Sequence, residues 1–325
     1  MKIVIADYPQ SDLSLEENLV KEAGMSFKAA EPQCRTPDDV IRAGAEADAL
    51  VVQYAPVTKE VLEALPGLHI VSLPMIGVDP VDVESARRHG VWVANVPDGC
   101  FQETAIHGLA MVLGLIRHLP FFDRLVRTGN WGYEATGHLR RPGELTLGIV
   151  GLGRIGSYVA ACAAPIFGKI LGHDPMSDAG RWPDGVERVD ELTALVRQSD
   201  VLTFHVPLTS ETHHLVGREL LAEARPGAYL VNVSRGPVVD PHALLDALDS
   251  GQLTGAALDV FEKEPPDTDD RLRSHPKVMV SPHAAFYSVQ SDEEARTRSI
   301  MNIIDYARVG RPNDVVVSGT KTWIF

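Results

Sequence analysis

Apolar stretches of strand length alternate with longer segments of helical period along most of the 325-residue chain. The first hundred residues contain four such stretches, at 2–6, 49–53, 68–73 and 91–96. This alternation predicts a parallel sheet whose strands are joined by crossover helices. A second series ("TLGIVGLG", "KILGHD", "VLTFHV", "AYLVNVS", "GAALDV", "KVMVSP") consists mostly of continuous apolar runs, typical of strands covered on both faces. We therefore expect an α/β fold with two doubly wound, Rossmann-like parallel-sheet domains.

The region between the two series has a different pattern. Residues 103–120 predict one long, mostly apolar helix that ends at Pro120, and residues 127–144 are rich in turn formers without periodicity. A domain junction is expected at about 97–99, just before the helix. The helix is apolar on too many sides for a lone surface helix, which predicts burial between domains or at a subunit interface. Near the end of the chain, residues 291–310 predict a helix that opens with "SDEE".

Charge and cysteine content narrow the class of protein. The formal net charge of −14 is spread along the chain, which argues against nucleic acid as a partner. Cys34, Cys100 and Cys162 are far apart and form no CxxC pair, so we expect neither a disulfide nor a cysteine-based metal site. The N-terminus lacks the pattern of a signal peptide, and no apolar run approaches the roughly 20 residues of a membrane span. These features predict a cytoplasmic protein without a membrane partner.

The segment "GIVGLGRIGSYVA" has the G-x-G-x-x-G pattern at Gly151, Gly153 and Gly156, after a predicted strand and before a predicted helix. In that context Gly151 permits a tight turn and Gly153 allows backbone N–H groups to approach a pyrophosphate. Gly156 lets the helix pack closely on the strand. A glycine-rich turn without a ligand is the alternative. The motif predicts a dinucleotide site.

Asp174 ends the next predicted strand, where an acidic side chain would accept hydrogen bonds from the ribose hydroxyls of the adenosine. A carboxylate there repels the 2′-phosphate of NADP, and no Arg or Lys follows before Arg181. NAD is therefore expected rather than NADP. A capping or turn aspartate is the alternative reading.

Polar side chains follow three later predicted strands, where the ligand crevice of such a sheet lies. Arg235 follows the first, Asp259 and Glu264 follow the next, and His283 follows the last. A guanidinium binds a substrate carboxylate and polarises the adjacent carbonyl, and an imidazolium donates a proton to the developing alkoxide while a carboxylate orients it. Each residue also has an ordinary structural reading, but together they predict a catalytic trio of Arg235, Glu264 and His283 that supports hydride transfer to a carbonyl.

The motifs "GLGRIG", "HVPLTSETHHLVG", "RPGAYLVNVSRGPVVD", "GAALDVFEKEPP" and "SPHAAF", in this order, closely resemble the D-isomer-specific 2-hydroxyacid dehydrogenase family. The resemblance implies a nucleotide domain (99–284) inserted into a flavodoxin-like substrate domain (1–98 plus 285–325), and a homodimer. It also implies a small 2-keto or 2-hydroxy acid as substrate, with Arg235 binding the substrate and Glu264 and His283 forming the acid–base pair. The cofactor positions implied by the resemblance are Thr104, Arg154, Ile155, Val206, Pro207, Val233, Ser234 and Asp259.

The expected substrate loop departs from the family pattern R-x-G-x-G-x-D-N. The segment "LPMIGVDP" keeps Gly77 and Asp79 but has Leu73, Met75 and Pro80 at the Arg, first Gly and Asn positions. Backbone N–H groups near Ile76 and Gly77 could still hold a carboxylate, since that contact does not depend on the side chain. Phosphite dehydrogenase, a relative, would call for a lysine where Ile76 stands, which disfavours phosphite.

Several histidines have no assigned role in the chemistry. His205 is expected at a strand end near the cofactor, and His107 is expected to belong to a helix packing face together with Ile106, which stands where the family often has Glu. His213 and His214 are adjacent in the chain, so they are expected to project differently and to bind no metal.

Two kinds of protein have these motifs and differ in function. The first is an NAD(H)-dependent oxidoreductase that interconverts a 2-keto acid and a D-2-hydroxy acid. The second is an NADH-sensing regulatory protein resembling the C-terminal-binding corepressors. The absence of long disordered extensions favours the enzyme.

Overall fold

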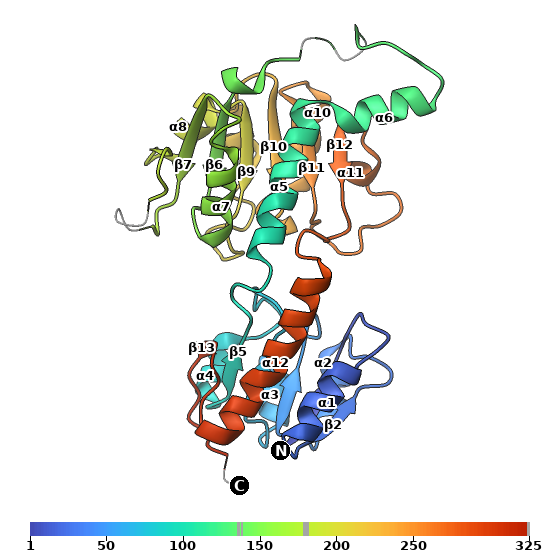
Figure 1. The fold of residues 1–325 in the computed structure, drawn as a ribbon, viewed down its shortest axis with the longest axis vertical. Helices are drawn as coiled ribbons and strands as arrows, with labels where there is room; N and C mark the ends of the chain where they lie inside the picture. The colour runs from blue at the N-terminus through green and yellow to red at the C-terminus, as the bar shows by residue number, and fades with distance from the viewer. Residues whose placement is uncertain (135–136, 138, 178–181, 324–325) are drawn as a thin grey trace. The chain divides into compact units, whose positions relative to one another are not determined.

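The computed structural model describes the whole chain except residues 135–136, 138, 178–181 and 324–325 (Figure 1). It divides into two compact units. Unit 1 comprises Met1–Cys100 and Ser288–Phe325, and unit 2 comprises Phe101–Tyr287. The domain boundaries expected from the sequence lie within three residues of these divisions.

Unit 1 is built on a six-stranded sheet with the order β13-β5-β4-β3-β1-β2. All neighbouring strands are parallel except β13, which is antiparallel to β5. The order 2-1-3-4-5 of the first five strands is flavodoxin-like. The elements are β1 (Lys2–Ile5), α1 (Ser14–Glu22), β2 (Ser26–Ala29), α2 (Pro37–Gly44), β3 (Ala49–Val51), α3 (Lys59–Ala64), β4 (Ile70–Ser72), α4 (Val83–Arg88), β5 (Trp92–Ala94), α12 (Val289–Val309) and β13 (Val315–Val317).

Helix α12 covers one face of this sheet. Its buried side chains Ile300, Ile303, Ile304 and Tyr306 pack with strand residues that include Ile3. The helix begins two residues earlier than the "SDEE" pattern predicts, because Ser288 is the N-cap: it accepts the N–H of Ser291 and forms a capping box with it. Gly310 ends it in a left-handed conformation with a φ of 83°.

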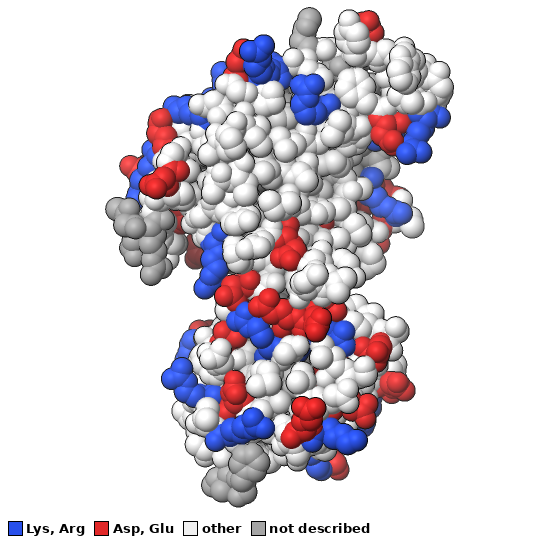
Figure 2. Space-filling model, in the orientation of Figure 1, with Lys and Arg blue, Asp and Glu red and all other residues white. Residues whose placement is uncertain are grey.

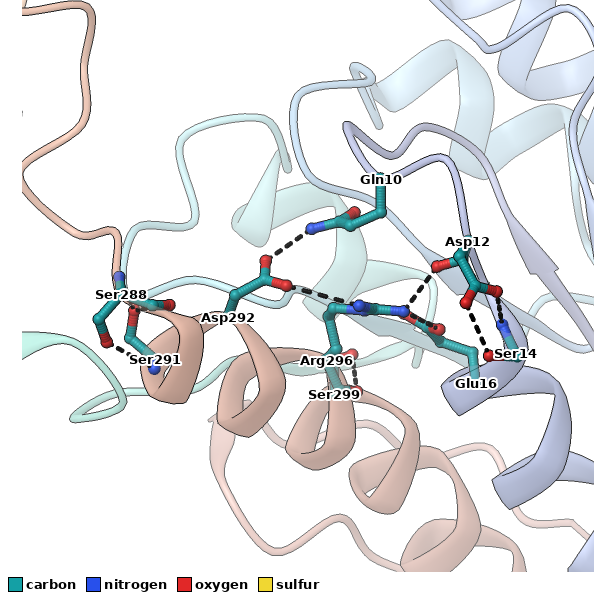
Figure 3. Close-up of polar contacts among 9 residues, drawn as sticks. All are labelled: Gln10, Asp12, Ser14, Glu16, Ser288, Ser291, Asp292, Arg296 and Ser299. Atoms are coloured by element: carbon teal, nitrogen blue, oxygen red, sulfur yellow. Dashed lines mark hydrogen bonds and ion pairs between the residues drawn. The ribbon is translucent and has the colours of Figure 1, made fainter.

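A buried ion pair joins the first half of α12 to α1 (Figure 3). Arg296 donates to both carboxylate oxygens of Glu16, with Nε–Oε1 and Nη2–Oε2 distances of 2.6 and 2.7 Å. Arg296 also donates to the carbonyl of Asp12, and Gln10 donates to Asp292. The two ends of the chain in unit 1 are therefore held by a bidentate, charge-assisted contact as well as by apolar packing.

Unit 2 contains a seven-stranded parallel sheet with the order β12-β11-β10-β9-β6-β7-β8. The strand order reverses between β6 and β9, as in the doubly wound Rossmann arrangement. The elements are α5 (Phe101–Ile116), α6 (Leu119–Arg127), η2 (Pro142–Glu144), β6 (Thr146–Val150), α7 (Arg154–Ala163), β7 (Lys169–His173), β8 (Glu187–Arg188), α8 (Leu192–Gln198), β9 (Val201–Phe204), α9 (Arg218–Ala222), β10 (Ala228–Asn232), η4 (Gly236–Val238), α10 (Pro241–Asp249), β11 (Leu253–Leu258), α11 (Arg271–Ser274) and β12 (Val278–Val280).

The prediction of one helix over 103–120 is wrong at its end. Helix α5 ends at Ile116, and a second helix, α6, starts at Leu119. His118 between them has a φ of 52°, a left-handed conformation that turns the chain, and Pro120 lies in the first turn of α6. Proline is tolerated there because the first-turn N–H groups have no intrahelical acceptor.

Among the described residues, no single helix combines the length and the hydropathy needed to cross a membrane. Helices α5 and α6 meet both criteria only as a pair, with a bend of 60° between them.

Candidate active site

The carboxyl ends of the unit 2 strands carry most of the residues that the sequence singles out. The strand order reverses between β6 and β9, and open α/β sheets bind ligands in the crevice at such a point. The loop after β6 contains the glycine motif, Asp174 follows β7, and the loops after β9, β10, β11 and β12 contain most of the other candidates.

The glycine motif forms a tight turn between β6 and α7. Gly151 has a φ of 87°, and a Cβ there would lie 2.6 Å from the carbonyl oxygen of His205. A Cβ on Gly156 would overlap the carbonyl oxygen of Gly151, so this glycine allows α7 to pack against the turn. A Cβ on Gly153 would meet nothing within 4 Å. Space is therefore open at Gly153, directly before the N-terminus of α7, where a pyrophosphate would be held.

Asp174 follows β7 and is tied to the glycine turn. Its carboxylate accepts the backbone N–H of Leu152 at 2.8 Å and that of Met176 at 2.9 Å. The side chain thus fixes the turn after β6 from the neighbouring strand. The open space at Gly153, the helix N-terminus and this carboxylate fit a bound NAD.

The other expected cofactor residues have different degrees of exposure. Arg154 and Ile155 form the first turn of α7. Val206 and Pro207 follow β9, and Pro207 is exposed. Val233 is buried in the core beneath the strand ends, and Thr104 is buried on α5. Any contact between Val233 and a cofactor would therefore use mainly its backbone.

Arg235 lies in the loop after β10, and the fully buried Asn232 organises this loop. The Asn232 amide donates to the carbonyl of Arg235 at 2.8 Å, and its oxygen accepts the N–H of Ser234 at 3.0 Å. Gly236, the next residue, lies so close to the carbonyl of Phe261 that a Cβ would overlap it. The loop that carries Arg235 therefore packs directly on the loop that carries Glu264.

His283 and Glu264 form a hydrogen-bonded pair. His283 Nδ1 lies 2.6 Å from Glu264 Oε2, and both side chains are partly exposed. The other carboxylate oxygen of Glu264 accepts the N–H of Phe261 at 2.9 Å. His283 has a φ of 50°, a left-handed conformation that is uncommon outside glycine and that recurs at functional sites. Since Nδ1 is engaged by the carboxylate, Nε2 is the ring nitrogen left for a substrate.

Asp259 holds the turn that presents His283. Its side chain is 1% exposed, and it accepts the N–H groups of Ala284 and Ala285 at 2.9 and 3.0 Å. It also accepts the hydroxyl of Ser281, and its carbonyl accepts the N–H of His283 at 2.7 Å. Asp259 is therefore a structural anchor of the turn that carries His283, in addition to the cofactor contact expected of it.

The sequence indicated no role for His107 beyond helix packing. Its Nε2 lies 3.0 Å from Ser281 Oγ and 3.6 Å from Asp259 Oδ1, so α5 supports the His283 turn through this side chain. Ile106 is 48% exposed and does not pack inside the unit. The sequence shows only a histidine next to an isoleucine within a predicted helix. This pattern alone does not indicate a contact with residue 281.

His205 lies between the glycine turn and the core. Its Nε2 lies 3.0 Å from Thr203 Oγ1, whereas no partner for its buried Nδ1 is present among the described residues. Burial lowers the pKa of His205 to about 4. The imidazole is therefore neutral at physiological pH. The backbone carbonyl of the same residue is the group that a Cβ on Gly151 would meet.

The expectation that His213 and His214 project differently is wrong. Their ring centroids are 4.1 Å apart with an interplanar angle of 32°, because His214 has a left-handed φ of 51° that turns its side chain to the same side as that of His213. Ligand atoms of both rings and of Glu262 lie within 4.8 Å of one another.

Ile76 and Gly77 lie in unit 1, in the loop between β4 and α4. The Asn95 amide donates to the carbonyl of Ile76 at 2.6 Å, and the Val96 N–H donates to the carbonyl of Met75 at 3.0 Å. Within the described residues, the backbone N–H groups of Ile76 and Gly77 have no protein acceptor. Leu73, at the position of the family arginine, is fully buried.

Comparison with known proteins agrees with this geometry. Residues 109–285 match the family described as D-isomer specific 2-hydroxyacid dehydrogenase, NAD binding domain. A glyoxylate reductase of Korarchaeum cryptofilum is 38% identical over 283 residues, which are 83% of each chain. A D-3-phosphoglycerate dehydrogenase of Bacillus subtilis is 36% identical over 262 residues, and the match spans 80% of this chain but only 50% of that longer relative.

A solved structure extends the similarity to both units. The D-lactate dehydrogenase from Aquifex aeolicus, complexed with NAD and lactic acid, is similar with a TM-score of 0.88 and 28% identity. The match covers 98% of this chain and 100% of that one. The chain is therefore an NAD-binding enzyme, and it belongs to the D-isomer-specific 2-hydroxyacid dehydrogenase family.

Proposed function

We propose that the protein interconverts 2-keto acids and D-2-hydroxy acids with NAD(H). The observation that carries this proposal is the 2.6 Å pair of His283 Nδ1 and Glu264 Oε2, held in a left-handed turn at the carboxyl edge of the NAD-binding unit. Bound NADH supplies the hydride that reduces the carbonyl carbon of the keto acid.

The residues of the chain divide the remaining work. His283 donates a proton from Nε2 to the carbonyl oxygen as that oxygen gains charge, and in the reverse direction Nε2 removes the hydroxyl proton. Glu264 holds the ring by Nδ1 and so leaves Nε2 for the proton transfer. Arg235 binds the substrate carboxylate and polarises the adjacent carbonyl with its guanidinium.

Within unit 1, the loop that carries Ile76 and Gly77 is suited to binding a carboxylate. The backbone N–H groups of Ile76 and Gly77, which no protein acceptor takes up within the described residues, are suited to a carboxylate oxygen. Such a contact tolerates the replacement of the family arginine by Leu73.

The test is NADH oxidation, with NADPH in parallel, against glyoxylate, hydroxypyruvate, pyruvate, phenylpyruvate and branched 2-keto acids. We expect turnover with NADH on at least one class and, where the product is chiral (glycolate from glyoxylate is not), oxidation of its D but not its L enantiomer. Tight NADH binding, measured by fluorescence titration, without turnover on any of them would overturn the proposal.

We also propose that the enzyme is a homodimer, on the evidence of exposed apolar side chains in unit 2. Figure 2 shows a broad area without charged residues over α5 and α7. Exposed large side chains on α5, α6 and the segment after them are Ile106, Leu119, Val126, Trp131 and Tyr133. Exposed apolar surface of this kind marks association sites. Sedimentation velocity should give a dimer, and Leu119→Glu combined with Trp131→Ser should shift it toward the monomer.

A further inference from the structure

We propose that His213, His214 and Glu262 form a binding site for a divalent transition-metal ion, with Zn²⁺ as the first candidate. The three ligand atoms lie within 4.8 Å of one another. Two imidazoles and one carboxylate are a ligand set that Zn²⁺ uses in proteins, and imidazole also suits Cu²⁺ and Ni²⁺. The site is outside the catalytic trio.

The backbone brings the two imidazoles together before any ion binds. Adjacent residues in an extended chain point to opposite sides, but the φ of 51° at His214 places the rings side by side with centroids 4.1 Å apart. His214 is held in this conformation because its N–H donates to the carbonyl of Pro237 at 2.7 Å. The fold thus already orders the two histidine side chains, which reduces the conformational entropy lost when an ion binds.

The segment behind the histidines is anchored to a neighbouring loop. Val216 pairs with Val239 in a parallel bridge, and the N–H groups of Val216 and Asp240 complete it at 3.0 and 3.1 Å. Glu262 reaches the cluster from the loop after β11, with its carboxylate oxygens 3.2 and 3.3 Å from His214 Nε2. The ligands therefore come from two loops on one side of the sheet.

The exposure of the cluster suits an ion that enters from solvent. His213 and Glu262 are exposed and His214 is half-buried, so three protein ligands would leave a fourth position for water. A bound ion would connect the loop after β9 to the loop after β11. Glu262 is two residues from Glu264, so the ion would restrict the segment that carries the partner of His283.

The first test is calorimetric titration of the chelator-treated full-length protein with Zn²⁺, and with Co²⁺ monitored by its visible absorption. We expect one equivalent to bind, with nitrogen and oxygen ligation in the Co²⁺ spectrum. His213→Ala and Glu262→Gln should each weaken binding by about tenfold or more, since losing even an outer-shell partner of a metal ligand costs 10- to 100-fold. His242→Ala removes another exposed imidazole of unit 2 and should leave binding unchanged.

Hydrogen exchange gives a second readout that is independent of dehydrogenase activity. Adding Zn²⁺ should slow exchange at amides of residues 208–215 and 259–266 in the parent protein and in His242→Ala, but not in Glu262→Gln. Binding that is equal in the parent protein, His213→Ala and Glu262→Gln would overturn the proposal and place the ion elsewhere, for example on His283 and Glu264. Circular dichroism of each variant checks that it is folded.

Discussion

The backbone N–H of His283 donates a hydrogen bond of 2.7 Å to the carbonyl oxygen of Asp259. The buried carboxylate of Asp259 accepts the N–H groups of the next two residues, Ala284 and Ala285, so one aspartate holds the backbone at and after His283. The left-handed conformation of His283 depends on these contacts.

Replacement of Asp259 by Asn should disturb this turn. Asparagine has one acceptor oxygen in place of two, so its amide group would face a backbone N–H that the carboxylate now accepts. Loss of a buried hydrogen bond to a charged group lowers the free energy of unfolding by about 1.5–3 kcal/mol. We expect a fall in kcat of about tenfold or more and a lower melting temperature, measured by NADH oxidation and thermal denaturation.

The matched control is Asp240→Asn. Asp240 also accepts two backbone N–H groups, those of His242 and Ala243 at the start of α10. Asparagine caps a helix about as well as aspartate, so this replacement should leave both stability and kcat nearly unchanged. Equal losses of kcat in the two variants would argue against a specific role of Asp259.

His283→Ala tests the acid–base role directly. Loss of the proton donor should lower kcat by about 10² or more while leaving the dissociation constant of NADH nearly unchanged. Glu264→Gln, which keeps an acceptor for the N–H of Phe261, should lower kcat less than His283→Ala does. A parallel loss of NADH affinity in His283→Ala would make this histidine a structural residue.

Two glycines of one motif should respond differently to alanine. A Cβ on Gly156 overlaps the carbonyl oxygen of Gly151, so Gly156→Ala should lower the melting temperature of the cofactor-free protein. Gly153 has open space and a φ of −69°, which alanine adopts without strain. Gly153→Ala should therefore keep the melting temperature and weaken NADH binding, because the methyl group occupies the approach of the pyrophosphate. Unchanged NADH affinity in Gly153→Ala would contradict the assigned site.

His205 should make stability depend on pH. Its pKa is about 4 in the folded protein and about 6.5 when unfolded, so the unfolded state binds the extra proton as the pH falls below about 6.5. Stability should fall between about pH 6.5 and 4 by up to about 3 kcal/mol from this group. His205→Gln, which does not titrate, should show a weaker fall in urea unfolding at about pH 5 relative to about pH 7.5. Equal pH dependence of the two proteins would exclude His205 as the source.

The sequence predicted the two parallel sheets because apolar runs buried on both faces leave a strong signal. It did not predict β2, since this strand alternates exposed and half-buried residues, nor β8, which has two charged residues. It misplaced the end of α5 because the left-handed His118, rather than Pro120, interrupts the helix.

The sequence likewise predicted only part of the candidate site. Glu264 and His283 could be predicted because each follows a strand of one sheet. The roles of Asn232 and His107 could not, because they depend on which loops pack together. The convergence of His213, His214 and Glu262 depends on one backbone dihedral and on two loops separated by more than 45 residues.

Helix α12 has a consequence for the order in which the chain folds during synthesis. The core of unit 1 needs Ile300, Ile303, Ile304 and Tyr306, which a ribosome adds only after the whole of unit 2 has been made. Residues 101–287 can close around their own cores first, while the strands of residues 2–94 still have one apolar face uncovered. Exposed apolar surface of this kind makes a nascent chain prone to aggregation and to chaperone binding. The unit that starts the chain is thus the last to fold, and Arg296 reaches Glu16 only at that final step.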